Sequence, residues 1–359
     1  MRRIAVCAVA ALGAGAVVAT ATPAVAAPAP HRVRTITTGL DGPFGLQVSS
    51  ARSLLVAENV SGEITRVSTR TGSKRVLVSN LPAPAGVGSR RGSLYVALSG
   101  PNEDGVPTPG RFAPTSVLKA RSDGSQLRVL ANLEKYELAH NPDRQVQFVN
   151  GKPVDALSNP FSVNVSKYGL LVADGGANDV LRVGRRSGKV STFFAPPTVK
   201  IPACLRPGVQ ANPGTVGCDP VPTGIAVARG SIYVSTLGAE VPGAGRVYQL
   251  NPHNGRVRRV WTGLTAPTGI AVAPNGTIFV SHVLEGAPAG PPAPGFDPAT
   301  VGAITRISPS GKRTTAQVTM PTGLQYRNGS LYATSWSVAS FLGIEHAGQV
   351  VKVDRRAFR

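Results

Sequence analysis

Residues 222–236 read PTGIAVARGSIYVST, and residues 267–281 read PTGIAVAPNGTIFVS. Both stretches join a Pro-x-Gly anchor to an apolar run, a tight turn and a second short apolar strand. β-Branched and aromatic residues on either side of a Gly-containing turn are typical of a β-hairpin. The two copies indicate that this hairpin is a structural unit that the chain repeats.

The same unit recurs along the whole chain with weaker identity. The six anchors are Pro43-Phe44-Gly45, Pro84-Ala85-Gly86, Pro160-Phe161-Ser162, Pro222-Thr223-Gly224, Pro267-Thr268-Gly269 and Pro321-Thr322-Gly323. A third strand follows each hairpin, and a Gly-containing turn then leads to a fourth strand. One copy alone would be an ordinary hairpin, whereas six in register indicate propeller blades. We therefore predict an all-β fold, a six-bladed β-propeller.

The two ends of the chain predict how the ring closes. The sixth copy ends at Asp354 after three strands, and residues 355–359 are too few for a fourth. The missing strand is predicted at the other end, over residues 32–38. The segment that leaves it, TGLDGPFG at residues 38–45, has the same spacing as TGLTAPTG at residues 262–269, which joins the fourth blade to the fifth. The N-terminal strand should therefore complete the last blade and remove the exposed strand edges.

The first 26 residues are predicted to be a signal peptide. Arg2 and Arg3 precede an apolar run over residues 4–18, and Ala24-Val25-Ala26 is a small-x-small cleavage site. The apolar run is shorter than the roughly 20 residues that a membrane span needs. We expect a single domain over residues 27–359, secreted after cleavage near Ala26, monomeric and without a transmembrane segment.

Two cysteines remain in the exported part of the chain. Cys204 and Cys218 lie in one Pro- and Gly-rich stretch. In an oxidising compartment such a pair is expected to form a disulfide that closes a loop. The chain-entropy model gives such a loop a gain on the order of 3 kcal/mol.

The long insertions are predicted to lie on one face of the disc. With strands a to d running outward from the axis, the a–b and c–d turns lie on one face, the turn face. The b–c loops and the d–a linkers lie on the other, the loop face. The insertions are b–c loops at residues 98–114, 236–244, 282–301 and 335–347, and d–a linkers at residues 132–157 and 195–220. Binding residues concentrate in long loops on a rigid scaffold.

The chain is strongly basic, with a formal net charge of +20. The short turns carry Arg52, Arg70, Lys74, Arg90, Arg91, Arg185, Arg186, Lys189, Arg229, Lys312, Arg313 and Arg327, whereas acidic residues collect on the loop face. The simplest interpretation of this charge separation is that the basic residues form a solvated rim. A more specific interpretation is that the turn face contacts an anionic cell-wall polymer. Nucleic acid is not expected, because the turns lack the interleaved aromatic residues that stack on bases.

Residues just after strand b are predicted to lie at the loop-face mouth of the central channel. These ligand-binding candidates are Glu58, Asn59, Asp174, Glu240, His282, Glu285 and Trp336. Within the turn that begins at Asp174, the metal candidates are Asp174, Asn178 and Asp179, because Ca²⁺ takes carboxylate and amide oxygens. The alternative, which we favour, is a tight turn in which Asp and Asn cap their own backbone.

No nucleophile site is predicted, because the five histidines include no His-x-x-x-His pair and the chain has no Gly-x-Ser-x-Gly elbow. We therefore expect a binding or scaffolding protein that holds a protein, glycan or small molecule on the loop face. The alternative is a Ca²⁺-assisted hydrolase or lactonase, or a sugar oxidoreductase, with its site at the channel mouth. Whether the protein is an enzyme stays open at this point, since a propeller scaffold by itself predicts no chemistry.

The blade sequences resemble those of the ScyD/ScyE family of exported bacterial propeller proteins, which are related to NHL-repeat and TolB-like propellers. Asn159-Pro160-Phe161, residues 171–183 (LVADGGANDVLRV), residues 221–227 (VPTGIAV) and an insertion at residues 133–141 carry the likeness. The resemblance implies six blades and export, and it implies no particular activity. Calcium-dependent lactonases and sugar-oxidising quinoproteins are more distant six-bladed relatives, whose signature acid and histidine positions do not map cleanly onto this chain.

Overall fold

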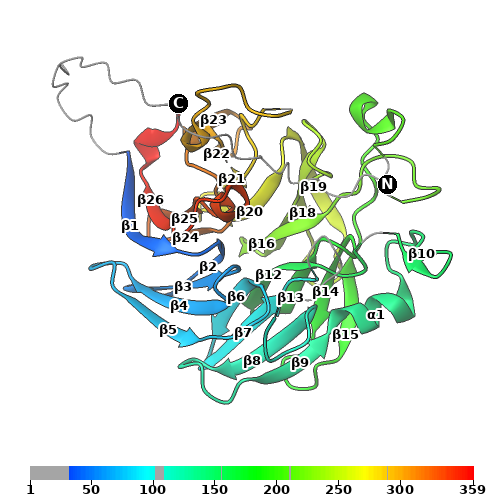
Figure 1. Cartoon of the computed structure of the whole chain (residues 1–359), viewed down its shortest axis with the longest axis horizontal. Coiled ribbons are helices and arrows are strands. Elements are labelled where there is room, and N and C mark those ends of the chain that lie inside the picture. The colour runs from blue at the N-terminus through cyan, green and yellow to red at the C-terminus, as the bar shows by residue number, and fades with distance from the viewer. Residues whose placement is uncertain (1–31, 102–108, 155, 210–211, 289) are drawn as a thin grey trace.

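The computed structural model describes residues 32–101, 109–154, 156–209, 212–288 and 290–359. The predicted signal peptide, residues 1–26, lies outside the described residues. Within them, six four-stranded antiparallel sheets stand around a central axis (Figure 1). The predicted six-bladed β-propeller is confirmed.

Each of the first five blades takes four strands in chain order. Blade 1 contains β2 (Pro43–Ser50), β3 (Ser53–Glu58), β4 (Glu63–Ser68) and β5 (Lys74–Val78). Blade 2 contains β6 (Pro84–Arg90), β7 (Ser93–Leu98), β8 (Ser116–Arg121) and β9 (Arg128–Asn132). Blade 3 contains β12 (Pro160–Ser166), β13 (Gly169–Asp174), β14 (Asp179–Val183) and β15 (Val190–Phe194). Blade 4 contains β16 (Pro222–Ala228), β17 (Ser231–Thr236), β18 (Gly245–Leu250) and β19 (Val257–Leu264). Blade 5 contains β20 (Pro267–Val272), β21 (Ile278–His282), β22 (Ala303–Ile307) and β23 (Arg313–Gln317).

The sixth blade joins the two ends of the chain. It contains β24 (Leu324–Arg327), β25 (Ser330–Ser335), β26 (Gly348–Val353) and β1 (Val33–Leu40). Strand β1 runs antiparallel to β26, from the pair Val33 and Val353 to the pair Leu40 and Gly348. The predicted closure is confirmed, and the N-terminal strand continues two residues beyond its predicted end. The backbone of Arg359 also exchanges two hydrogen bonds of 2.9 Å with Thr315, which fastens the C-terminus beside β23.

The connections and the C-terminal segment carry the few helical elements. They are α1 (Leu133–His140), η1 (Pro202–Leu205), η2 (Pro298–Thr300), η3 (Ala339–Leu342) and η4 (Arg355–Ala357), with a small hairpin of β10 (Phe148–Val149) and β11 (Lys152–Pro153). Asn132 caps α1 by accepting a hydrogen bond from the Lys135 amide, and Asn141 ends the helix in the left-handed conformation. The insertion noted at residues 133–141 is therefore this capped helix.

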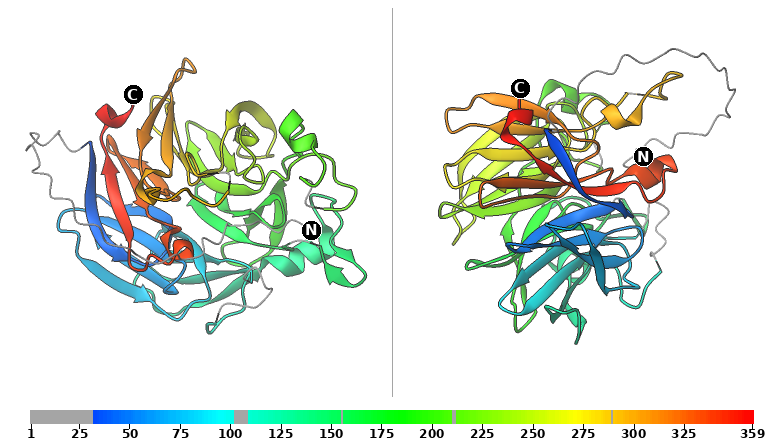
Figure 2. Two further views of the ribbon diagram at one scale, coloured as in Figure 1. Left: turned by 45° about the horizontal axis from the view of Figure 1, so that its top comes forward. Right: turned by 90° about the vertical axis from the view of Figure 1, so that its left-hand side faces the viewer.

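The predicted long b–c loops and d–a linkers are present in the described parts of the chain. In antiparallel blades all of these connections leave from the same ends of the strands, which defines the loop face. Figure 2 shows η2 and η3 projecting on that side of the disc. Residues 102–108, in the first predicted b–c loop, lie outside the described residues. Among the described residues, no helix combines the length and the apolar character of a membrane span.

The blades pack face to face, and the inner strands approach one another most closely at the anchor glycines. A Cβ atom on Gly86 would lie 2.7 Å from the Val163 nitrogen and 2.8 Å from the Ser162 Cα atom in blade 3. On Gly269, a Cβ atom would lie 2.0 Å from the Thr322 carbonyl oxygen. The Pro-x-Gly repeat therefore reflects a steric need, because neighbouring backbones occupy the space that a side chain would take.

We predict that Gly86→Ala pushes blades 2 and 3 apart and lowers the free energy of unfolding by about 1–3 kcal/mol, the usual cost of overpacking a core. Ser162→Ala is the matched control, because blade 3 already accommodates a Cβ atom at the equivalent position. Urea unfolding followed by circular dichroism measures both. Equal stability of Gly86→Ala and the wild type would contradict the steric argument.

Candidate functional site

Four blades end their second strand with a polar residue that holds the incoming linker. Each hydrogen bond reaches the linker residue two positions before the strand-a proline. The pairs are Glu58 Oε2 with the Asp41 amide at 2.9 Å, Asp174 Oδ2 with Ser158 Oγ at 2.5 Å, His282 Nδ1 with the Thr265 carbonyl at 2.6 Å and Ser335 Oγ with the Thr319 carbonyl at 2.9 Å. We call these four residues the linker anchors. All four are buried, and none lines the central channel.

The turn that begins at Asp174 is held by its own side chains. Asp174 also accepts hydrogen bonds from the amides of Asn159 at 2.6 Å and Ala177 at 3.2 Å. Asn178 accepts one from the Val221 amide at 3.1 Å and donates one to Asp143 Oδ2 at 3.1 Å. Asp174 therefore caps the backbone of its own turn, as the alternative interpretation of the sequence describes, whereas Asn178 bonds two distant segments, at Val221 and Asp143.

The other residues named from the sequence are spread over the loop face. Asn59 donates to Ser99 Oγ at 3.4 Å. Glu240 is half-buried in the b–c loop of blade 4, and Glu285 is exposed near His282. Trp336 packs against a buried cluster that contains Val283, Val301 and Met320. The structure thus brings Glu285 near His282 and does not gather the whole predicted set at one point.

The mouth of the central channel is aromatic and hydroxylated. Phe44 and Phe161 stack there with ring centroids 5.7 Å apart. On the opposite side, Thr223, Thr268 and Thr322 each donate a hydrogen bond of 3.0–3.1 Å to the anchor-proline carbonyl of the next blade. The described residues that line the channel include no acidic, basic or histidine side chain. This surface suits an uncharged ligand.

A second concave site lies beside blade 3. We call it the acidic pocket, and it is lined by Glu137, Asp143, Gln145, Val146, Gln147, Ala156, Leu157, Gly176 and Asn212. Its empty space, part of it open to solvent, is about 260 Å³. Because that figure includes open solvent, the enclosed space is much smaller and does not hold a drug-sized ligand. The site therefore suits an ion or a small polar group.

Asp179 at the start of β14 is the most unusual side chain near the acidic pocket. It is 0 % exposed, and neither carboxylate oxygen has a hydrogen-bond partner. Glu137 is 3 % exposed, and its Oε2 atom also lacks a partner, although Gln147 donates to Oε1 at 2.9 Å. Burying a carboxylate without a partner is costly, so this arrangement calls for a proton or a bound cation.

The pKa values of these groups follow from burial and mutual repulsion. Burial raises the pKa of Glu137 to about 7, with a hydrogen bond from Gln147 opposing it and the charges of Asp143 and Asp174 adding to it. Burial raises the pKa of Asp174 to about 6, against its hydrogen bonds. Burial, followed by the charges of Asp174, Glu137 and Asp143, holds the pKa of Asp179 well above its usual range. No basic side chain is among the causes for any of the three.

Sequence reasoning identified Asp179 but missed Glu137 and Asp143. Glu137 lies on α1, and Asp143 lies in the segment that follows it. Both precede the Asp174 turn by more than thirty residues, in a stretch with no metal-ligand spacing. Only the folding of the 132–157 linker against blade 3 brings them to Asp179, so linear spacing held no signal for this group.

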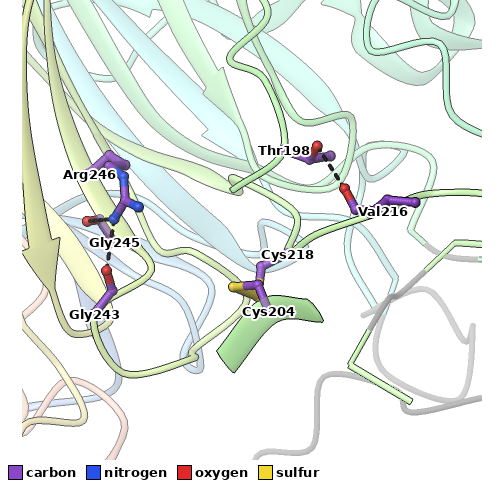
Figure 3. Close-up of a disulfide and its surroundings, with 7 residues drawn as sticks. All are labelled: Thr198, Cys204, Val216, Cys218, Gly243, Gly245 and Arg246. Carbon is purple, nitrogen blue, oxygen red and sulfur yellow. Dashed lines mark hydrogen bonds between the residues drawn. A yellow bond between two sulfur atoms is a disulfide. The ribbon is translucent and has the colours of Figure 1, made fainter. Parts of the chain in front are cut away.

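The predicted disulfide between Cys204 and Cys218 is present (Figure 3). The loop that it closes is also held by a hydrogen bond of 3.1 Å from Thr198 Oγ1 to the Val216 carbonyl. Within this loop, Asn212 and Thr215 donate to Gln145 Oε1 at 2.7 and 3.0 Å. The disulfide loop therefore forms one wall of the acidic pocket, and Gln145 ties it to the linker that carries Glu137.

Solved structures of other propellers resemble this chain in fold. A calcium-binding protein, regucalcin, from Agrobacterium tumefaciens is 12% identical, with a TM-score of 0.54 over 90% of this chain and 95% of its own. A gluconolactonase from Xanthomonas campestris is 11% identical, with a TM-score of 0.54 over 89% of this chain and 88% of its own. A glucose dehydrogenase is 15% identical, with a TM-score of 0.54 over 89% of this chain and 98% of its own.

These likenesses support the six-bladed fold. No family model matches the chain, and no curated protein matches it. The resemblance to the ScyD/ScyE family therefore stays a prediction. By fold, the chain is a six-bladed β-propeller similar to regucalcin and gluconolactonase.

We predict that His282 makes the fold sensitive to acid. Burial lowers its pKa, although the Thr265 carbonyl and the charge of Glu285 oppose this shift. The folded pKa of His282 lies below its unfolded value of about 6.5. The stability that the neutral His282 side chain contributes is therefore fully present above a pH of about 6.5, and it is lost as the pH falls through the folded pKa. His282→Gln should remove this component, measured as the free energy of urea unfolding at pH 8 and pH 5.

His253→Gln is the control, because His253 is exposed on a turn of blade 4. This control should keep the pH dependence of the wild type. If His282→Gln lost as much stability as the wild type between pH 8 and pH 5, another group would be responsible.

Proposed function

We propose that the protein is a cation-assisted propeller enzyme, a hydrolase of small esters or lactones, with its site in the acidic pocket. The observation that carries this proposal is Asp179, a fully buried carboxylate with two unpartnered oxygens, which is not itself part of the pocket lining but lies close enough to the lining residues Glu137 and Asp143 for their charges to raise its pKa. Glu137 Oε2 adds a third unpartnered oxygen nearby, and Asn212 Oδ1 adds a fourth at the pocket wall. A group of acceptor oxygens that no donor reaches suits a cation better than a neutral group.

The residues fit Ca²⁺ as part of an oxygen shell. Ca²⁺ takes six to eight oxygens from carboxylates, amides, carbonyls and water. Within the described residues, no three His, Cys, Asp or Glu side chains form a complete metal site. Asp179 and Glu137 would therefore hold the ion together with Asn212, and water or substrate would supply the remaining oxygens.

The surrounding side chains set the shape of the site. Gln147 donates to both Glu137 Oε1 and the Glu137 carbonyl, at 2.9 and 3.1 Å, and so fixes the direction of this carboxylate. Asn178 holds Asp143, and Gln145 holds the disulfide loop. These contacts preorganise the carboxylates before anything binds, which reduces the cost of ordering them.

The chemistry proposed is the addition of water to a carbonyl carbon and the breakage of the ester C–O bond. A cation at Asp179 would polarise the carbonyl oxygen of such an ester or lactone. The calcium-binding regucalcin and the gluconolactonase of the same fold support this choice over a purely structural role. The disulfide fits an extracellular protein, and we propose that the chain is exported.

We predict that Asp179→Asn separates cation binding from folding. In EDTA the variant should be at least as stable as the wild type, because an unpartnered buried carboxylate is removed. Adding Ca²⁺ to about 100 times its Kd should stabilise the wild type by about 2.7 kcal/mol and the variant not at all. Thermal unfolding measures both, and hydrolysis of glucono-lactone should be lost in the variant.

Glu134→Gln is the matched control, because Glu134 lies on the same helix outside the pocket lining. The control should respond to Ca²⁺ as the wild type does. A wild type with the same melting temperature in EDTA and in Ca²⁺, and with no activity on a panel of lactones, would refute the proposed function.

A second candidate function is the binding of an uncharged ligand at the channel mouth. It is favoured by the stacked rings of Phe44 and Phe161, which are half-buried at the loop-face opening. The Thr hydroxyls opposite them are already engaged with backbone carbonyls. A ligand with a flat apolar face would stack on the rings without displacing these bonds.

We predict that Phe161→Ala weakens the binding of such a ligand by about two- to tenfold, because an aromatic contact contributes roughly 0.5–1.5 kcal/mol. Calorimetry with aryl glycosides as probes would measure the loss. Phe296→Ala, at an exposed loop position, should leave affinity unchanged. Equal affinities for all three proteins would place the ligand elsewhere.

A further inference from the structure

Exposed cations surround the turn-face end of the channel in two rings. The inner ring comes from a–b turns: Arg52, Arg91, Lys167, Arg229 and Arg327. The outer ring comes from c–d turns and from the chain segment that replaces this turn in blade 6: Arg70, Arg121, Arg186, Arg256, Lys312 and Arg355. We call these eleven side chains the cation rings. All are exposed.

Acidic side chains do not neutralise the cation rings. The turn face carries Asp123 and Asp354, which accept hydrogen bonds from nearby backbone amides at 2.9 and 2.8 Å. No cation-ring residue is part of the salt bridge found in the described residues, which joins His346, when it is protonated, to Asp41 on the loop side. Two carboxylates against eleven cations leave most of the positive charge of the turn face uncompensated, and it attracts anions over a distance set by the salt concentration.

Other basic side chains hold the turns in place from below. Arg66, Lys119 and Arg182 each donate to a carbonyl in the c–d turn of the next blade, at 2.7, 2.9 and 3.0 Å. The bond acceptors are Ser122, Arg185 and Pro252. The outer-ring segments of blades 2, 3 and 4 are thus braced, which reduces the backbone ordering needed when a partner binds.

The composition of the turn face limits the kind of partner. Arg makes up all but two of the cation-ring residues, and its planar guanidinium matches phosphate oxygens in pairs. None of the exposed large apolar side chains lies in these turns, so insertion into a membrane has no anchor. Tyr168, the aromatic residue beside Lys167, is half-buried against Lys167 and His253 and does not offer a face for stacking bases.

We propose that the turn face is a binding surface for a flexible, linear, phosphate-bearing polyanion. A flexible chain along the outer ring meets a cation from each successive blade, and along the inner ring it meets one from every blade except blade 5. A rigid duplex crosses the disc along one line and meets fewer of them. This surface is separate from the acidic pocket, so the inference is independent of the proposed function.

The experiment uses long-chain inorganic polyphosphate as the probe and the full exported chain. The turn-face variant combines Arg52→Gln, Arg91→Gln, Arg186→Gln and Arg327→Gln. The control variant combines Arg111→Gln, Lys152→Gln, Lys200→Gln and Arg206→Gln, which are exposed positions away from the cation rings. Both variants lose the same net charge, and circular dichroism confirms that both are folded.

The expected result is a loss of at least about tenfold in affinity for the turn-face variant at about 0.15 M salt, against less than about twofold for the control. The slope of log K against log salt should fall by about one for each arginine removed that contacts phosphate. An equal loss in the control would show that net charge alone acts and would overturn the proposal. Tighter binding to duplex DNA or to phosphatidylserine vesicles than to polyphosphate, or no binding to polyphosphate, would overturn it as well.

Discussion

The pairing of β1 with β26 is the interaction on which the rest of the molecule depends. It joins residues more than three hundred positions apart and turns six hairpin units into a closed ring. Near the axis, Thr322 reaches across the same seam and donates to the carbonyls of Pro43 and Phe44. Without this pairing the edge of β26 in blade 6 would be open, and open strand edges favour aggregation.

Ring closure also decides where chemistry is placed. Antiparallel blades return the chain to the same side after every second strand, so long b–c loops and d–a linkers share the loop face. The acidic pocket uses two of these linkers, one with α1 and one with the disulfide, packed against the turn of blade 3. The connections on the other side are short turns that present exposed charged side chains, and these side chains form the cation rings. The two faces are therefore suited to different partners.

The buried polar groups of the loop face fall into two kinds with different energetic consequences. Each linker anchor has at least one hydrogen-bond partner, so its burial stabilises the path of its linker, although His282 Nε2 is left without one. Asp179 and Glu137 Oε2 have none in the described part of the chain. A fold that retains an unpartnered buried carboxylate accepts a cost in stability, and such groups cluster at functional sites. This contrast is the reason for placing the site beside blade 3 rather than at the channel mouth.

The sequence by itself determined the number of blades, their order, the closure by the N-terminal strand, the disulfide and the face that carries the long loops. These features follow from local signals, since a Pro-x-Gly anchor, an alternating strand and a tight turn each lie within about fifteen residues. The tertiary structure alone decided which polar residues are satisfied. Asp174 and Asp179 stand five positions apart in one turn, yet the first bonds Ser158 and Asn159 while the second is left beside Glu137. That difference depends on how two distant linkers pack against blade 3, and no local pattern encodes such a contact.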